Sequence, residues 1–164
     1  MSASTKVISS VESFNDLLQE VDPSQVFVLT DSNTIKHCLP RFEELYLGGT
    51  PYSSISVEAG EDSKSVAIAE EIWQTLIEAN ADRSSLLISL GGGMITDLGG
   101  FMASTYKRGI ASLLVPTTHL SMTDAAIGGK TGVNFLDLKN QIGTVHDVEG
   151  VLVDSSFLET LPER

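Results

Sequence analysis

Short runs of continuous apolar residues alternate along this chain with segments in which apolar residues recur at helical spacing. The runs predict buried strands at Val26–Thr30, Leu86–Leu90 and Ile110–Val115, and shorter strands at Ile55–Val57 and Val151–Val153. Continuous apolar strands are typical of a parallel sheet that is covered on both faces. We therefore expect an α/β fold, a Rossmann-like parallel sheet with helices on both faces.

Two helices are predicted between these strands. The first runs from Asp62 to Asn80, where apolar residues recur every three or four positions with polar residues between them. Asp62 and Ser63 can cap its start, and Asn80 can end it. The second runs from Met94 to Tyr106 and follows a triple glycine directly. The order of strands and helices thus agrees with the expected parallel sheet.

Composition and charge narrow the class of protein. A length of 164 residues suits one domain with a proper core. The formal net charge of −12 argues against a nucleic-acid-binding surface, which needs a basic stripe. The sequence has no membrane-length apolar run, no signal-peptide pattern and a single cysteine, Cys38. We expect a cytoplasmic protein that binds neither nucleic acid nor membrane.

The triple glycine Gly91–Gly93 stands between a predicted strand and a predicted helix. Backbone N–H groups at such a helix start can bind a phosphate group. The dinucleotide-binding fingerprint is incomplete, however, because Thr96 stands where its third glycine belongs. An equally weighted alternative is a tight strand-to-helix turn in which Asp97 stabilises the first turn of the helix.

A second group of glycines, within residues 128–132, surrounds Lys130. A P-loop is excluded because Asp124 occupies the position of its first glycine and no apolar strand leads directly into the segment. Asp124 and Lys130 could still converge on one ligand. The simpler alternative is an ordinary ion pair between them within a loop.

The three histidines, His37, His119 and His146, are widely separated in the sequence. None belongs to a paired spacing on one helix, and Cys38 stands alone. A zinc site made wholly by this chain is therefore not expected. The sequence also lacks the Gly-x-Ser-x-Gly elbow of a hydrolase triad.

Taken together, the motifs after about residue 25 resemble the 3-dehydroquinate synthase family of sugar-phosphate cyclases. The resemblance rests on GGGMITDLGGF (91–101), TYKRG (105–109), VPTT (115–118), DAAIGGKTGVN (124–134), LKNQIG (138–143) and FLETLP (157–162). Upstream, residues 31–33 and 59–64 are similar to the first cofactor contacts of that family. Each motif is weak by itself, but their order and spacing are specific. The triple glycine with Asp97 is also shared with glycerol-dehydrogenase-like enzymes.

The resemblance implies an NAD site. Asp31 and Asn33 would hold the adenosine ribose, and Thr117 and Thr118 would line the nicotinamide side. The full set of implied cofactor contacts is Asp31, Asn33, Glu61, Lys64, Gly92, Gly93, Asp97, Thr117, Thr118, Lys130, Lys139, Phe157 and Thr160. Of these, Gly92, Gly93 and Asp97 would receive the pyrophosphate, which agrees with the helix-start argument above.

The resemblance also implies a substrate site and a missing domain. Asp124, Lys130 and Asn140 would bind the sugar-phosphate substrate, and Arg108 would reach a substrate phosphate across a homodimer interface. The divalent metal of the family, zinc or cobalt, would take its ligands from an all-helical C-terminal domain. Residues 1–164 would then be the NAD-binding N-terminal domain, inactive without the rest.

Three functions remain open at this point. The first is 3-dehydroquinate synthase, in the shikimate pathway to chorismate and the aromatic amino acids. The second is a sister cyclase that acts on another sugar phosphate, and the run GGKTG (128–132) favours the first over it. The third is a non-catalytic NAD-binding module. Departures from the family pattern include Thr96, His119, Leu138 and residues 145–148.

Overall fold

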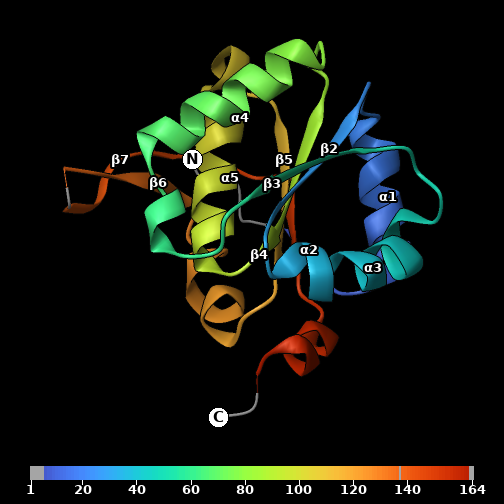
Figure 1. The fold of residues 1–164 in the computed structure, drawn as a ribbon. Coiled ribbons are helices and arrows are strands. Elements are labelled where there is room, and N and C mark those ends of the chain that lie inside the picture. Colours follow the sequence, from blue (N-terminus) through green and yellow to red (C-terminus); the bar gives the residue numbers. More distant parts are fainter. Residues whose placement is uncertain (1–5, 137, 163–164) are drawn as a thin grey trace.

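A computed structural model describes residues 6–136 and 138–162 of the chain. Its centre is a six-stranded parallel sheet with the order β1-β8-β5-β4-β2-β3. The strands are β1 (Val7–Ile8), β2 (Val26–Asp31), β3 (Ser53–Val57), β4 (Leu86–Gly91), β5 (Ala111–Pro116) and β8 (Gly150–Leu152). The sheet is covered by helices on both faces (Figure 1), as the apolar strand pattern predicts.

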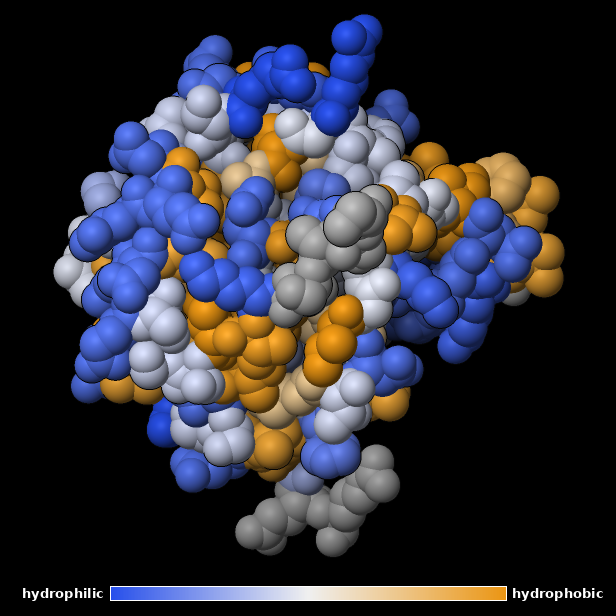
Figure 2. Space-filling view, turned by 180° about the vertical axis from the view of Figure 1, so that it is seen from behind, coloured by the Kyte–Doolittle hydropathy of each residue, from blue (hydrophilic) through white to orange (hydrophobic). Residues whose placement is uncertain are grey.

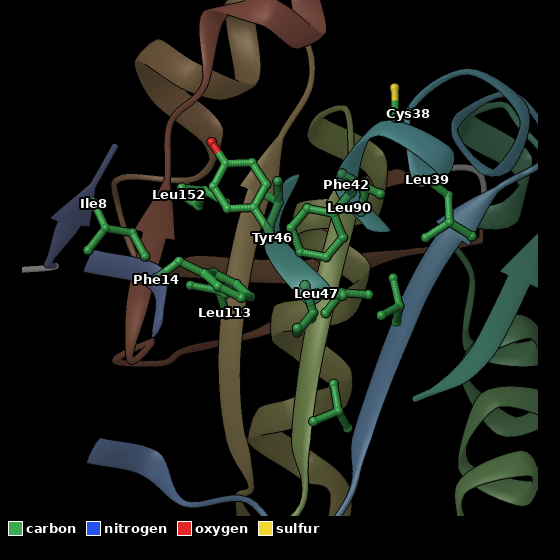
Figure 3. Packing of buried hydrophobic residues seen from close by; sticks show 14 of the residues in the cluster. Ile8, Phe14, Cys38, Leu39, Phe42, Tyr46, Leu47, Leu90, Leu113 and Leu152 are labelled. Atoms are coloured by element: carbon green, nitrogen blue, oxygen red, sulfur yellow. The ribbon is translucent and has the colours of Figure 1, made fainter. Parts of the chain in front are cut away.

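One face of the sheet is covered by α1 (Val11–Val21), α2 (Thr34–His37), α3 (Leu39–Phe42) and the π-helix η1 (Glu43–Leu47). Phe14, Phe42 and Tyr46 make mutual ring contacts with centroids 5.5–5.7 Å apart. Their packing against Leu90, Leu113 and Leu152 of the sheet is visible in Figure 3. This face therefore has a continuous aromatic and aliphatic core.

The other face is covered by α4 (Val66–Glu78) and α5 (Gly93–Thr105). The long predicted helix is shorter than expected at its start. A separate 3₁₀ turn, η2 (Glu61–Ser63), precedes it, and Ser65 caps α4 by accepting the Ile68 N–H. Asn80 follows the end of α4 with φ 56°, the left-handed conformation expected of a helix-ending residue.

Between β5 and β8 the described residues form an antiparallel hairpin and no long α-helix. The hairpin is formed by β6 (Lys130–Phe135) and β7 (Leu138–Val145), and the π-helix η4 (Ser121–Ala125) precedes it. It packs on α5, where a Cβ on Gly100 would lie 2.6 Å from Thr131 Cγ2. Glycine at position 100 thus allows the hairpin to approach the helix closely. Apolar side chains gather on its protruding end (Figure 2), where the strand pairing places exposed Phe135, Leu136 and Leu138.

The sequence patterns did not predict α1, β1 or the hairpin. The signal for α1 was present, since Ser10 forms a capping box and Phe14 and Leu17 lie on its buried face. Short 3₁₀ helices, η3 (Tyr106–Arg108) and η5 (Ser155–Thr160), complete the described structure. No helix in the described residues is both long and apolar enough to cross a membrane.

Candidate active site

The order of the strands defines where a ligand would bind. From β2 the chain moves outward to β3 and then returns across β2 to β4, so its direction reverses between β2 and β4. In doubly wound sheets the ligand crevice lies outside the carboxyl ends of the strands at this reversal. Asp31 ends β2 and Gly91 ends β4, so two of the motifs singled out from the sequence flank it.

Helix α5 begins in this crevice. Its first helical bond joins the Thr96 N–H to the Gly92 carbonyl, so the N–H groups of residues 93–95 have no partner within the helix. A Cβ on Gly92 would lie 3.2 Å from Thr118 Cγ2, and glycine keeps this approach open. Thr96 is buried and donates its hydroxyl to the Gly93 carbonyl at 3.1 Å. Thr96, which takes the place of the third glycine of the fingerprint, therefore directs its hydroxyl towards the backbone of its own helix.

A cavity of about 460 Å³ lies at this end of the sheet. Six of the predicted cofactor contacts line it: Asp31, Asn33, Gly92, Thr117, Thr118 and Thr160. Asp31 Oδ1 accepts the N–H groups of Asn33 and Thr34 at 2.9 and 2.8 Å, which fixes the turn after β2. Residues spread over 130 positions of the chain thus meet at one opening.

Some residues of this cavity were not predicted, and several predicted cofactor contacts, Phe157 among them, do not line it. His37, Cys38 and Leu161 also line the cavity. Burial raises the pKa of the Cys38 thiol, which lies 3.4 Å from Thr160 Oγ1. A single cysteine in the sequence gives no signal that its side chain will line a ligand cavity. Phe157 is fully buried in the hydrophobic core and does not line the cavity.

A second cavity, of about 590 Å³, lies between α5 and the hairpin. It is lined by Asp97, Asp124, Lys130 and Asn140, together with Thr131, Thr144 and neighbouring residues. Asp124 comes from η4, Lys130 begins β6 and Asn140 lies in β7. The three residues predicted to bind substrate therefore share one cavity.

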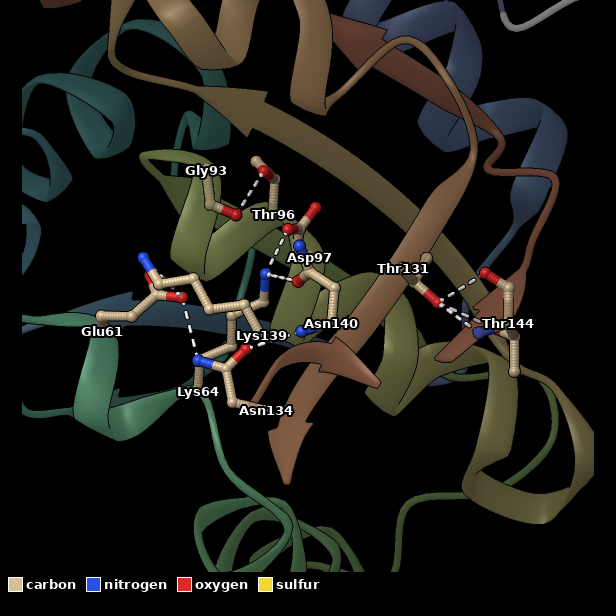
Figure 4. Close-up of polar contacts among 10 residues, drawn as sticks. All are labelled: Glu61, Lys64, Gly93, Thr96, Asp97, Thr131, Asn134, Lys139, Asn140 and Thr144. Carbon is tan, nitrogen blue, oxygen red and sulfur yellow. Dashed lines mark hydrogen bonds and ion pairs between the residues drawn. The ribbon is translucent and has the colours of Figure 1, made fainter. Parts of the chain in front are cut away.

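Lys64 is the centre of a polar network at the wall of this second cavity (Figure 4). Its ammonium lies 2.5 Å from Asp97 Oδ2 and also donates to Asn140 Oδ1. The Lys64 side chain is only 4% exposed and that of Asp97 20%. The partner of Asp97 is thus Lys64, and Asp97 lies beyond the first turn of α5, so the alternative of a first-turn acid is wrong.

The electrostatics of Asp97 are unusual for a salt-bridged carboxyl. Burial raises its pKa above the ordinary value, and the Lys64 ammonium only partly offsets this effect. The carboxylates of Glu61 and Asp124 act in the same direction as burial. Ionisable groups with perturbed pKa values in a cleft are typical of functional sites.

Glu61, Lys64 and Lys139 do not line the first cavity. They border a separate opening of about 520 Å³ between η2 and the hairpin, which Asn134 also lines. Lys139 Nζ lies 3.9 Å from Glu61 Oε1, and both side chains are exposed. The predicted cofactor contacts that line a cavity therefore fall into three groups: those of the first cavity, those of this opening, and Asp97 and Lys130 in the second cavity.

Arg108 lines neither of the two cavities. It follows α5 in η3 and precedes β5, at the amino end of the sheet, with φ 68°. Helix α5 has 13 residues and begins at Gly93, so it spans about 20 Å at the usual helical rise, and Arg108 follows its carboxyl end. The structure does not bring Arg108 to the other predicted substrate contacts of its own chain.

The fold and its crevices define a class: a doubly wound α/β protein with ligand cavities at the carboxyl ends of its strands. Comparison with known proteins then gives the family. The pattern of the family described as 3-dehydroquinate synthase N-terminal matches residues 54–164. The chain belongs to the 3-dehydroquinate synthase family.

Relatives named 3-dehydroquinate synthase include those of Solibacter usitatus and Pyrococcus abyssi. The first is 44% identical over 140 residues, covering 85% of this chain and 39% of the relative. The second is 44% identical over 156 residues, covering 95% of this chain and 46% of the relative. The chain therefore spans less than half the length of these relatives.

Solved structures agree with the fold. A 2-epi-5-epi-valiolone synthase from Streptomyces hygroscopicus, with NAD⁺ and Zn²⁺ bound, is 28% identical with a TM-score of 0.81. The match covers 98% of this chain and 46% of that one. A probable glycerol dehydrogenase from Sinorhizobium meliloti is 16% identical with a TM-score of 0.67, covering 96% of this chain and 41% of that chain, and shares the fold alone.

Proposed function

We propose that this chain is the NAD-binding part of 3-dehydroquinate synthase. The whole enzyme would convert 3-deoxy-D-arabino-heptulosonate 7-phosphate to 3-dehydroquinate and phosphate. The observation that carries this proposal is the meeting of Asp124, Lys130 and Asn140 in one cavity beside Asp97. The relatives at about 44% identity support this activity over that of a sister cyclase.

The start of α5 fits the pyrophosphate of NAD. Glycines leave the backbone exposed there, and the N–H groups of the first turn carry partial positive charge. In a chain with a net charge of −12, such local dipoles must offset the general repulsion of an anion. If bound there, NAD⁺ would supply a hydride acceptor for the transient oxidation of a ring hydroxyl of the substrate.

The second cavity offers groups for a sugar phosphate. The Lys130 ammonium would attract the anionic end of the substrate or orient a hydroxyl. The Asp124 carboxylate accepts hydrogen bonds from hydroxyl groups, and the Asn140 amide can both donate and accept. Asp97 and Lys64 form the wall between this cavity and the η2 opening. They would therefore fix the position of the cofactor relative to the substrate.

Arg108 would act on the site of a second copy. Because Arg108 does not line the cavity that holds Asp124, Lys130 and Asn140, its role at a substrate phosphate would be exerted on a neighbouring subunit. The exposed apolar side chains of the hairpin are typical of an interaction surface and support such an assembly. We therefore infer that the enzyme is a homodimer.

The described residues do not fit a metal centre. They include no group of three or more His, Cys, Asp or Glu side chains that could hold a metal ion. The divalent metal proposed for the enzyme would take its ligands from other residues, so we assign this chain no step at the metal.

The test is release of inorganic phosphate from the seven-carbon sugar phosphate by the whole protein, with NAD and zinc present. Lys130→Ala should lower kcat/KM by roughly 100-fold, the scale of losing one placed electrostatic group. Lys6→Ala is the matched control, because Lys6 is a surface lysine paired with Glu20 at 3.0 Å. It should leave the rate unchanged.

Two results would contradict the proposal. Turnover of another sugar phosphate, with none of the seven-carbon substrate, would assign the chain to a sister cyclase. Full activity of Lys130→Ala would show that the second cavity is not where the substrate binds. On this proposal residues 1–164 alone should release no phosphate.

A further inference from the structure

Asn134, in β6, makes hydrogen bonds to three residues of the candidate site. Its Oδ1 accepts the backbone N–H of Asn140 at 2.9 Å, and its Nδ2 donates to Glu61 Oε1 at 2.9 Å. Its own backbone N–H donates to the Lys64 carbonyl at 2.8 Å. One residue thus joins the η2 segment to β7 across the hairpin (Figure 4).

The bond from Asn140 to Asn134 acts on a constrained backbone. Asn140 has φ 53°, in the left-handed region that asparagine tolerates better than most residues. Its N–H is held by Asn134, and its side-chain Oδ1 accepts from Lys64. These two contacts fix the orientation in which Asn140 lines the second cavity.

The chemistry at position 134 requires a primary amide. The side chain must accept from an N–H and donate to a carboxylate at the same time, which a carboxylate or an alkyl group cannot do. An aspartate would keep the bond from Asn140, but it would place a second negative charge against Glu61. The bond from Asn134 to Glu61 can therefore be broken while the bond from Asn140 to position 134 is kept.

We propose that Asn134 is a positioning residue that couples the cofactor side of the site to its substrate side. This inference rests on the proposed function, in which Glu61 and Lys64 contact NAD and Asn140 contacts the sugar phosphate. A ligand that orders Glu61 then also orders Asn140 through one side chain. By linkage, NAD and the substrate must each strengthen the binding of the other by the same factor.

The experiment measures this factor on the whole protein by calorimetry. The NAD dissociation constant is determined with and without a phosphonate analogue of the seven-carbon sugar phosphate, whose C–P bond cannot release phosphate. In the unchanged protein we expect the analogue to tighten NAD binding about fivefold or more, the lower end of typical coupling between sites. In Asn134→Ala and Asn134→Asp the factor should fall to within about twofold of one.

A donor–acceptor swap provides the rescue. In the paired variant Asn134→Asp with Glu61→Gln, the new amide can donate to the new carboxylate, so the link returns with its polarity reversed. We expect the coupling factor to recover. Since the factor is a ratio of two affinities, a uniform loss of NAD binding or of stability does not change it. Gln74→Ala, at an exposed amide that donates to Glu78 within α4, should retain full coupling.

The outcomes separate the two proposals. Unchanged coupling in Asn134→Asp, or no recovery in the paired variant, overturns the role of Asn134 and leaves the proposed function intact. If Asn134→Ala fails to fold, the Asn134→Asp pair still decides. If the unchanged protein binds neither NAD nor the analogue, the proposed function itself fails, and this inference fails with it.

Discussion

Replacing Lys64 by methionine should destabilise the fold in a pH-dependent way. The substitution keeps an unbranched side chain of similar length but removes the ammonium that contacts Asp97 and Asn140. Removing one partner of a buried ion pair typically costs about 3–5 kcal/mol, because the other charge stays buried without compensation. Asp97 is 20% exposed and partly reached by water, so we expect about 3 kcal/mol at pH 7.

The sign of the pH dependence follows from Asp97. Its folded-state pKa is already raised by burial, and loss of the ammonium raises it further. A carboxyl with a raised folded-state pKa favours folding below its unfolded pKa, and this contribution is lost as pH rises through the folded-state value. The deficit of Lys64→Met relative to the parent chain should therefore be largest at pH 7 and shrink towards pH 4.

The assay is urea unfolding followed by the fluorescence of Trp73, the single tryptophan, whose ring centroid lies 6.2 Å from that of Phe101. Lys139→Met is the matched control, because its ammonium is exposed and 3.9 Å from Glu61; it should cost at most about 0.5 kcal/mol. Adding Asp97→Asn to Lys64→Met should recover much of the loss. A deficit that is equal at pH 5 and pH 7 would refute the reasoning.

Three further predictions test other parts of the molecule. Gly99→Ala should lower the unfolding free energy by about 1–3 kcal/mol in urea, because its Cβ would lie 1.8 Å from Ser89 Oγ, and adding Ser89→Gly should relieve the loss. Burial lowers the pKa of His146, so its titration by NMR should give a pKa below the ordinary value. The contribution of His146 to the unfolding free energy is present above its unfolded-state pKa and should be lost as pH falls through its folded-state pKa, and His146→Gln should remove this pH dependence. Arg108→Ala should raise the KM for the sugar phosphate while NAD affinity stays unchanged, and an equal loss of both would contradict its role across the dimer.

Local patterns were sufficient to predict most of the sheet. The strands over Val26–Thr30, Leu86–Leu90 and Ile110–Val115 were found within one residue, because strands buried on both faces leave a continuous apolar run. The parallel arrangement with helices on both faces followed from the same runs. Helix α1 was missed although its amphipathic pattern and Ser10 cap were present in the sequence.

The hairpin could not be predicted in this way. Along β7 almost every side chain is exposed, so no apolar face marks it as a strand. Its position depends on Gly100 accepting Thr131 at close range and on the hydrogen bond that the Thr144 hydroxyl donates to Ser104 Oγ at 2.7 Å. Such contacts join residues far apart in the chain, and no local pattern records them.

The sequence by itself determined which residue types were available for binding, and where the chain turns from strand to helix at Gly91–Gly93. Only the tertiary structure decided which of these residues share a cavity: Asp31 lies with Thr117 in one, and Asp124 lies with Lys130 in another. It also paired Asp97 with Lys64 and placed Asn134 between Glu61 and Asn140. The physical reason is that a local pattern specifies an element and its buried face, whereas the partners of a polar side chain depend on how the elements pack.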